Sequence, residues 1–346
     1  MEKDKFNRTI TELDFTLMSS DMRGIPLGLF NGQMGICIYF FHLARLRNKP
    51  EYRTFAEKLL NQLFSSAHDV SAIHFPAGMS GIAWGIHHLL ENRFVTGSFD
   101  YVLQEADDLL YRTIHFEWLD DEKKSRTDFI WLLVYYADRL RTIKNKEEKT
   151  LAQKTVIRIL NHIEDFYSDT PWEHPAIFNL ETYELPLYLL ILGKLYKSDF
   201  YNYKIVQILE GLSNTVLSSM PALHANRLFL LAGIRSILQC IHMPQWEIHA
   251  GLLADNIDYD TIVNREFLNK NITLRRGVAG FCFLLSKLVE GEEISSGLKE
   301  DILRKIESSE IWEGRFNPAS SAIRGNVGLL NGYTGVILMY TMLLNS

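Results

Sequence analysis

The chain has 346 residues, of which 47% are hydrophobic and 12% aromatic, and its formal net charge is -6. This length and apolar content allow a large buried core. The charges are of mixed sign without a long basic block, which excludes the electrostatic footprint of a nucleic-acid-binding protein. Small molecules or peptides are therefore the expected partners.

The sequence gives no sign of export or of a membrane span. The first five residues are followed by polar residues instead of an apolar signal segment, so a cytoplasmic protein is expected. The longest apolar runs, residues 36–44 and 336–344, are much shorter than the roughly 18 residues that cross a bilayer. The three cysteines are few and widely spaced, which predicts no disulfide and fits a reducing compartment.

Two kinds of helix alternate from the start of the chain. Residues 2–20 have apolar side chains at helical spacing on one face, which predicts an amphipathic helix. Residues 36–46 are apolar on all sides, which predicts a buried helix. The same alternation continues with amphipathic residues 51–66, apolar residues 82–90 and amphipathic residues 101–118.

The alternation persists through the middle of the chain. Residues 129–140, 185–196 and 228–240 are apolar, and amphipathic residues 151–166 and 200–217 lie between them. No segment alternates polar and apolar residues convincingly enough to predict a strand. The sequence therefore predicts an all-α protein.

A glycine-rich turn precedes four of the apolar helices. It reads GLFNGQMG at residues 28–35 and GLLNGYTG at residues 328–335, with related copies at residues 78–85 (GMSGIAWG) and 277–280 (GVAG). Glycine has no side chain, so these residues are interpreted as providing tight turns and close helix packing. The same motif near both ends of the chain suggests a closed ring of repeats.

The repeat period is near fifty residues, since Gly81 and the matching Gly280 are 199 residues apart, which is about four periods. Such periods indicate stacked units of two helices, and a ring packs the last unit against the first. We therefore predict one domain, residues 1–346, that forms an α/α toroid of about seven inner and seven outer helices. An open α-solenoid is the alternative. The approximate unit starts are Gly28, Gly78, Thr127, Leu180, Ala222, Arg276 and Gly328.

With these turns and this period, the whole chain resembles the lanthionine synthetase C-like cyclases. The resemblance implies the seven-unit toroid and, in active members, closure of thioether rings in peptides. There a zinc-bound peptide thiolate adds to a dehydrated serine or threonine. Catalytic zinc sites supply three protein ligands and leave a fourth position for substrate. The family takes these ligands from Trp-Cys-Tyr-Gly before the fifth inner helix and Cys-His-Gly before the sixth.

This sequence departs from the family at those turns. Arg275 and Arg276 stand where the Cys-His pair would be, and guanidinium groups do not ligate zinc. His224 is the only residue near the other cysteine position that could bind a metal. Three ligands cannot be assembled, so no metal site and no cofactor are expected here, although zinc is the cofactor of the family.

The resemblance also assigns candidate catalytic residues. Asp128 matches the family's aspartate in the third turn, and Tyr183 aligns with its histidine in the fourth, so a phenol replaces a group that would protonate an enolate near neutral pH. With His224 they are the three candidates for catalysis. In the plain alternative, Asp128 caps its helix together with Thr127.

Candidate substrate-binding residues surround these turns. In a toroid, Arg275 and Arg276 would lie at the N-terminus of an inner helix, where the helix dipole also favours an anion such as a peptide carboxylate. Glu181 and Glu184 flank Tyr183 and could form an acidic lip opposite the arginines. The alternative for the arginines is a pair of surface cations. The inner-helix histidines His42, His87 and His88 are expected to pack in the core.

The function that these observations favour is a zinc-free, divergent member of the family, a pseudoenzyme of a peptide-modification pathway such as lantibiotic biosynthesis. It would bind a peptide substrate or a peptide-processing partner in the toroid cavity. One alternative is an active cyclase that works without zinc through Asp128 and Tyr183. Another is a carbohydrate-active toroid, in which Asp128 and Glu181 or Glu184 would act as acid and base.

Overall fold

The structure is a computed structural model that describes residues 3–287, 295–317, 319 and 325–345. All regular elements in these residues are helical. The inner helices are α2 (Gln33–Arg47), α4 (Met79–Glu91), α6 (Arg126–Arg139), α8 (Glu184–Lys197), α10 (His224–Leu238), α13 (Val278–Lys287) and α15 (Tyr333–Leu344). The outer helices are α1 (Lys3–Ser19), α3 (Pro50–Ala67), α5 (Phe99–Thr113), α7 (Lys146–Phe166), α9 (Asn202–Ser218), α11 (Pro244–Asp255) and α14 (Ser296–Glu307).

Short segments complete the described chain. They are η1 (Met22–Gly24), η2 (Ile114–Trp118), α12 (Tyr259–Thr261), η3 (Ile262–Glu266) and η4 (Glu310–Trp312). Of these, η2 and η3 are π-helical, and η2 directly continues α5.

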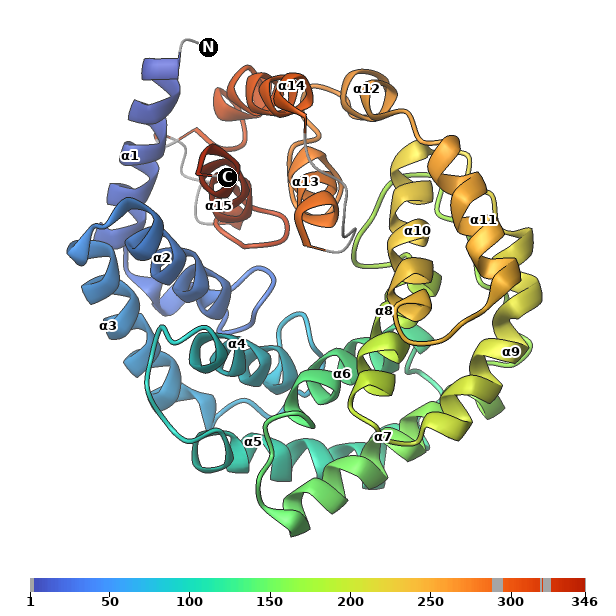
Figure 1. Cartoon of the computed structure of the whole chain (residues 1–346). Helices are drawn as coiled ribbons and strands as arrows, with labels where there is room; N and C mark the ends of the chain where they lie inside the picture. The colour runs from blue at the N-terminus through green and yellow to red at the C-terminus, as the bar shows by residue number, and fades with distance from the viewer. Residues whose placement is uncertain (1–2, 288–294, 318, 320–324, 346) are drawn as a thin grey trace.

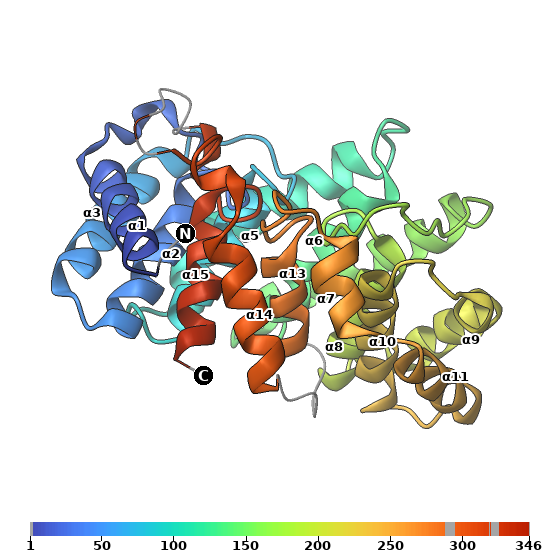
Figure 2. The same ribbon diagram turned by 90° about the horizontal axis from the view of Figure 1, so that it is seen from above.

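The inner helices form a closed ring. Each packs against the next along the chain, and α15 packs against α2. Figure 1 looks through this ring, with the outer helices around it, and Figure 2 shows from above that α15 lies between α2 and α13. The predicted α/α toroid is confirmed, because the last inner helix packs against the first, which an open solenoid would not do.

Burial separates the two helix types as their sequences predict. Ten of the twelve residues of α15 are buried, whereas only Ile302 and Ile306 are buried among the twelve of α14. An inner helix is covered by its two ring neighbours and an outer helix, so it must be apolar on nearly all sides. None of the described helices is both long and apolar enough to cross a membrane.

Buried carboxylates join outer helices to inner ones. Asp14 of α1 accepts hydrogen bonds from Tyr39 of α2, at 2.5 Å, and from Tyr52 of α3, at 2.8 Å. Arg139 at the end of α6 has no exposed side-chain surface and donates to Asp107 of α5 at 2.8 Å. Because each charged group is bonded to a partner on another helix, these clusters fix which helices are neighbours.

Candidate functional site

The turns before the inner helices are joined to one another by backbone hydrogen bonds. The amide of Phe30 donates to Pro76 O, that of Leu330 to Phe30 O and that of Arg275 to Leu330 O, each at 2.9 Å. The amide of Leu180 then donates to Arg275 O at 3.0 Å. The chain of bonds links the second, first, seventh, sixth and fourth turns, and it places the fourth turn directly beside the sixth.

Glu181 and Arg275 form an ion pair at this junction. Arg275 Nε lies 2.5 Å from Glu181 Oε2, and the two side chains are 26% and 18% exposed. The indole Nε1 of Trp131 donates to the Glu181 carbonyl at 3.0 Å, which holds the fourth turn against α6. Arg276 is exposed and makes no ion pair or hydrogen bond with another described residue. The sixth turn therefore carries one neutralised and one free guanidinium group.

Glu184 has a different partner. Its carboxylate receives hydrogen bonds from Arg126 Nε, at 2.8 Å, and from the hydroxyl of Thr127. Arg126 also donates to the carbonyls of Thr170 and Pro171 in the loop before α8. Its guanidinium lies 3.8 Å from the centre of the Trp172 ring. Of the two carboxylates expected to oppose the arginines, the structure pairs Glu181 with Arg275 and Glu184 with Arg126.

Asp128 belongs to a capping box at the start of α6. Its carboxylate accepts from the Ser125 amide at 2.9 Å and from the Ser125 hydroxyl at 2.8 Å, and its own amide donates to Ser125 Oγ. The capping partner is Ser125 and not Thr127, which bonds to Glu184 instead. This geometry satisfies backbone donors that the first helical turn leaves without partners.

Tyr183 is buried beside a histidine that the sequence did not single out. It lies immediately before α8, has no exposed surface, and its hydroxyl is 3.0 Å from His174 Nδ1. Burial raises the pKa of Tyr183 well above its ordinary value and lowers that of His174. Both groups are therefore neutral near pH 7. The contact spans nine residues of an irregular loop, which no spacing rule identifies.

His224 is the first residue of α10, and its amide and its ring atom Nδ1 are both hydrogen-bonded. Its amide and that of Ala225 donate to the carboxylate of Glu266, at 2.6 and 3.0 Å. Its ring atom Nδ1 accepts from the Asp258 amide at 2.9 Å. The negative charge of Glu266 lies at the positive end of the helix dipole. Glu266 was not a candidate from the sequence, because the helix terminus that it caps is distant in the sequence and becomes its neighbour only in the folded protein.

The residues at these turns do not fit the family's zinc site. Guanidinium groups have no lone pair for a metal, and Nδ1 of His224 already accepts a hydrogen bond. Cys37 and Cys282 are buried, and burial raises the pKa of Cys282 to about 12. Over the described residues, no three His, Cys, Asp or Glu side chains are arranged to hold a metal ion.

The carboxylates proposed for glycoside hydrolysis also have other partners. Asp128 caps α6, Glu181 pairs with Arg275, and Glu184 pairs with Arg126. An acid and base of this kind need two carboxyl groups that face one substrate. Each of the three is instead bonded to another residue of the chain.

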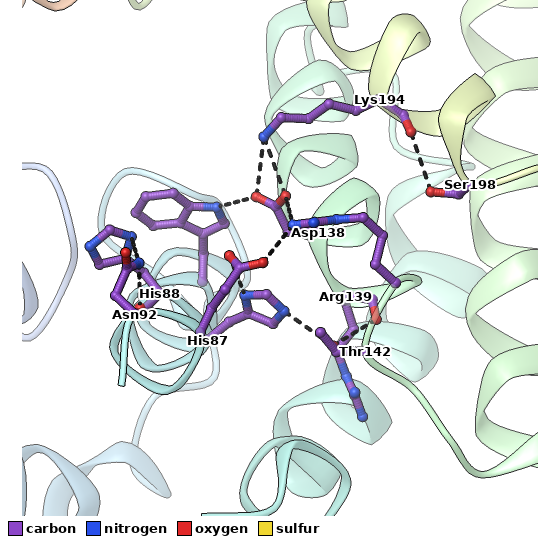
Figure 3. Close-up of polar contacts among 11 residues, drawn as sticks. His87, His88, Asn92, Asp138, Arg139, Thr142, Lys194 and Ser198 are labelled. Carbon is purple, nitrogen blue, oxygen red and sulfur yellow. Dashed lines mark hydrogen bonds and ion pairs between the residues drawn. The ribbon is translucent and has the colours of Figure 1, made fainter. Parts of the chain in front are cut away.

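A second polar cluster lies at the far ends of α4, α6 and α8 (Figure 3). Asp138, 5% exposed, accepts from Trp84 Nε1 at 3.0 Å, from Lys194 Nζ at 3.3 Å and from Arg141 Nη2 at 3.0 Å. Burial alone would raise the pKa of Asp138, but Lys194, Trp84 and Arg141 hold it below its ordinary value. Asp138 thus remains charged and joins three consecutive inner helices.

The inner-helix histidines pack next to this cluster, as expected from the sequence. His87 Nε2 lies 3.1 Å from Thr142 Oγ1. His88 Nε2 lies 2.9 Å from His42 Nε2. His88 also stacks on Trp84, with 5.4 Å between ring centres. Adjacent histidines therefore face different neighbours.

Comparisons with known proteins agree with this geometry. The family model described as lanthionine synthetase C-like protein matches residues 25–178. The matched segment is less than half of the chain, so the match shows a similarity of residues 25–178 to this family. A solved structure of a nisin cyclase superposes with a TM-score of 0.67 over 98% of this chain and 93% of that one, at 15% identity. At this identity, the superposition shows a common fold. No curated protein matches the chain.

The limits of the family match are informative. Residues 25–178 contain the first three turns and end before Glu181, His224 and Arg275. The turns at which this chain lacks the family's zinc-ligand residues therefore lie outside the matched segment.

Proposed function

We propose that this chain is a divergent lanthionine synthetase C-like protein that binds a peptide substrate or a peptide-processing partner without zinc, in a pathway of peptide modification. The family match over residues 25–178 and the common fold with a nisin cyclase support the peptide as ligand. The binding surface is the side of the toroid on which the joined turns lie.

The Glu181–Arg275 pair is the observation that carries this proposal. Arg275 lies in the turn from which the family draws two of three zinc ligands, and it forms an ion pair with Glu181 of the neighbouring fourth turn. Arg276 next to it is exposed and free to receive an anion. Guanidinium groups bind carboxylates through two parallel hydrogen bonds, so a peptide carboxylate is the natural partner.

Metal content gives the first test. Protein purified without chelator is analysed by inductively coupled plasma mass spectrometry, and the expected zinc content is far below one ion per chain. One zinc per chain that remains after gel filtration would refute the zinc-free function and would return the protein to the class of ordinary cyclases.

Binding gives the second test, with a candidate precursor peptide encoded beside this gene. We expect Arg276→Ala to weaken binding of the free-acid peptide about two- to fivefold, the range for one exposed ion pair, in calorimetry at low salt. Arg265→Ala removes a similarly exposed arginine from η3 and serves as the control. Equal affinity of both variants, or equal loss with the C-terminally amidated peptide, would count against Arg276 as the anion site.

A further inference from the structure

A separate pocket opens between the outer helices α7 and α9. It has a volume of about 540 Å³, lies apart from the turns described above, and is lined by α7, α8, α9 and the loop of residues 167–174. We call it the α7–α9 pocket. Ligand pockets in proteins range from about 300 to 1,000 Å³, so its size suits a small ligand or a few residues of a peptide.

A second pocket, with a volume of about 990 Å³, is an open groove between η1 and α3. None of the buried side-chain atoms without a hydrogen-bond partner belongs to a residue that lines that groove. The α7–α9 pocket differs from it in this respect, because it contains such an atom.

Two residues that line the α7–α9 pocket have a buried atom without a hydrogen-bond partner, Glu164 and Tyr188; Glu164 Oε2 forms an ion pair with Lys204, whereas the Tyr188 hydroxyl has no such partner among the described residues. Tyr188 lines the pocket and is 1% exposed, and its hydroxyl has no hydrogen-bond partner among the described residues. Its ring stacks on Trp172, with 5.4 Å between ring centres and 16° between planes, so its position is fixed. Buried hydroxyl groups are nearly always hydrogen-bonded in native proteins. An unpaired one beside a pocket therefore points to a ligand that completes the bond.

The state of this hydroxyl determines what it can offer. Burial, and then the nearby charge of Glu164, raise the pKa of Tyr188 well above its ordinary value. The group keeps its proton at any physiological pH and can donate a hydrogen bond. A carbonyl oxygen of the ligand is the matching acceptor.

The walls of the pocket restrict the rest of the ligand. Ile163, Ile208 and Leu212 provide apolar surface, and Glu164 and Asp169 provide carboxylates. Glu164 contacts Lys204, whereas Asp169 is exposed. No lysine or arginine is among the residues that line the pocket. The surface therefore suits an aliphatic group close to a cation.

A sugar fits this surface less well than a peptide does. Sugars pack on an open aromatic face, but Trp172 has Tyr188 on one face, and the Arg126 guanidinium lies 3.8 Å from its ring centre. A peptide needs no such face, and it supplies a carbonyl, an aliphatic side chain and a basic side chain on neighbouring residues.

We propose that the α7–α9 pocket binds a peptide segment in which an aliphatic residue adjoins a lysine or arginine. The aliphatic side chain lies on Ile163, Ile208 and Leu212. A peptide carbonyl oxygen accepts a hydrogen bond from the Tyr188 hydroxyl, and the basic side chain faces Asp169. This inference rests on the proposed function in one respect, that the ligand of the protein is a peptide.

The test uses the full chain and the blocked tripeptide acetyl-Lys-Leu-Gly-amide as probe, titrated in calorimetry or by NMR. Tyr188→Phe removes only the hydroxyl, and we expect binding to weaken about two- to tenfold while the melting temperature stays equal or rises, because an unpaired buried group is lost. Asp169→Asn should reduce the preference for this probe over acetyl-Glu-Leu-Gly-amide about two- to fivefold.

A blocking variant tests the place of binding. Gly211 lines the pocket on α9, and a side chain added there meets open space, so Gly211→Phe should fill the pocket without a clash and abolish binding. Gly251 on α11 also faces open space but does not line the pocket, which makes Gly251→Phe the matched control. Unchanged affinity in both Tyr188→Phe and Gly211→Phe would overturn the inference, as would the absence of any binding by the tripeptide.

Failure of the pocket and failure of the proposed function give different results. If the precursor peptide binds and responds to Arg276→Ala but not to Gly211→Phe, the pocket inference is wrong and the proposed function stands. If only the tripeptide binds, and Gly211→Phe abolishes its binding, the pocket is a peptide site and the role of the turns is refuted.

Discussion

His88 couples the stability of the protein to pH at the scale of a single residue. Its ring is partly buried between Trp84 and His42, and it lies 3.2 Å from the Asn92 amide nitrogen. Burial lowers the pKa of His88 to about 4. A histidine in an unfolded chain titrates near 6.5. Between these values the unfolded chain binds a proton at this residue that the folded chain does not.

The consequence is a loss of stability in acid. The folded-state pKa is depressed, so the stabilising contribution is complete above about pH 6.5 and decreases as the pH falls towards 4. From pH 7.5 to 5.0, His88 alone should lower the free energy of unfolding by about 2 kcal/mol. His88→Gln should remove about that much of the pH dependence, measured by urea denaturation at both values. The exposed His68→Gln is the control, and an identical pH dependence in both variants would contradict this assignment.

At the scale of an element, the paired glycines let each turn fold onto the helix that follows it. A Cβ added at Gly81, Gly280 or Gly335 would overlap a carbonyl oxygen of the turn that precedes its helix. The overlapping atoms are Phe75 O, Leu274 O and Leu329 O, which correspond in the repeat. Glycine is therefore needed at these positions because a side chain would not fit, as the sequence predicted, and not for ligand chemistry.

Two glycine substitutions separate this requirement from helix propensity. Gly335→Ala should destabilise the protein by about 1–3 kcal/mol or more, because the methyl group would collide with backbone and the turn must move. Gly251→Ala, in open space on α11, should stabilise it by about 0.5–1 kcal/mol. Urea denaturation measures both. Equal effects of the two variants would mean that the turn is not closely packed.

The same turns show how far sequence alone could describe the site. The glycine pairs and the period located the sixth turn and its arginines, because these features repeat locally. Glu181 and Glu184 were both predicted to lie opposite the arginines, but only Glu181 pairs with Arg275. The bond from Leu180 to Arg275 joins residues 95 positions apart, so no local pattern reveals it. The partners Arg126 of Glu184 and Lys194 of Asp138 were likewise missed, since they depend on which helices are neighbours and at what register.

At the scale of the whole molecule, closure of the ring joins the two ends of the chain. Phe6 of α1 is fully buried and packs on Trp312 and Tyr340, with ring centres 5.0 and 4.8 Å apart. The amide of Leu330 in the last turn also donates to Phe30 O in the first turn. In an open stack of repeats, an end unit frays alone. In a closed ring, the end units support each other, so a defect at the junction should affect every unit.

Phe6→Ala tests that cooperativity. Removing a buried phenylalanine should lower the free energy of unfolding by about 3–5 kcal/mol. Phe15→Ala, in the same helix but 71% exposed, should change it by less than about 0.5 kcal/mol. Because the ring closes on itself, hydrogen exchange in Phe6→Ala should accelerate in α8 and α10 as well as in α1 and α15. Acceleration confined to α1 and α15 would show that the junction unfolds alone, and it would contradict the prediction that residues 1–346 form one domain.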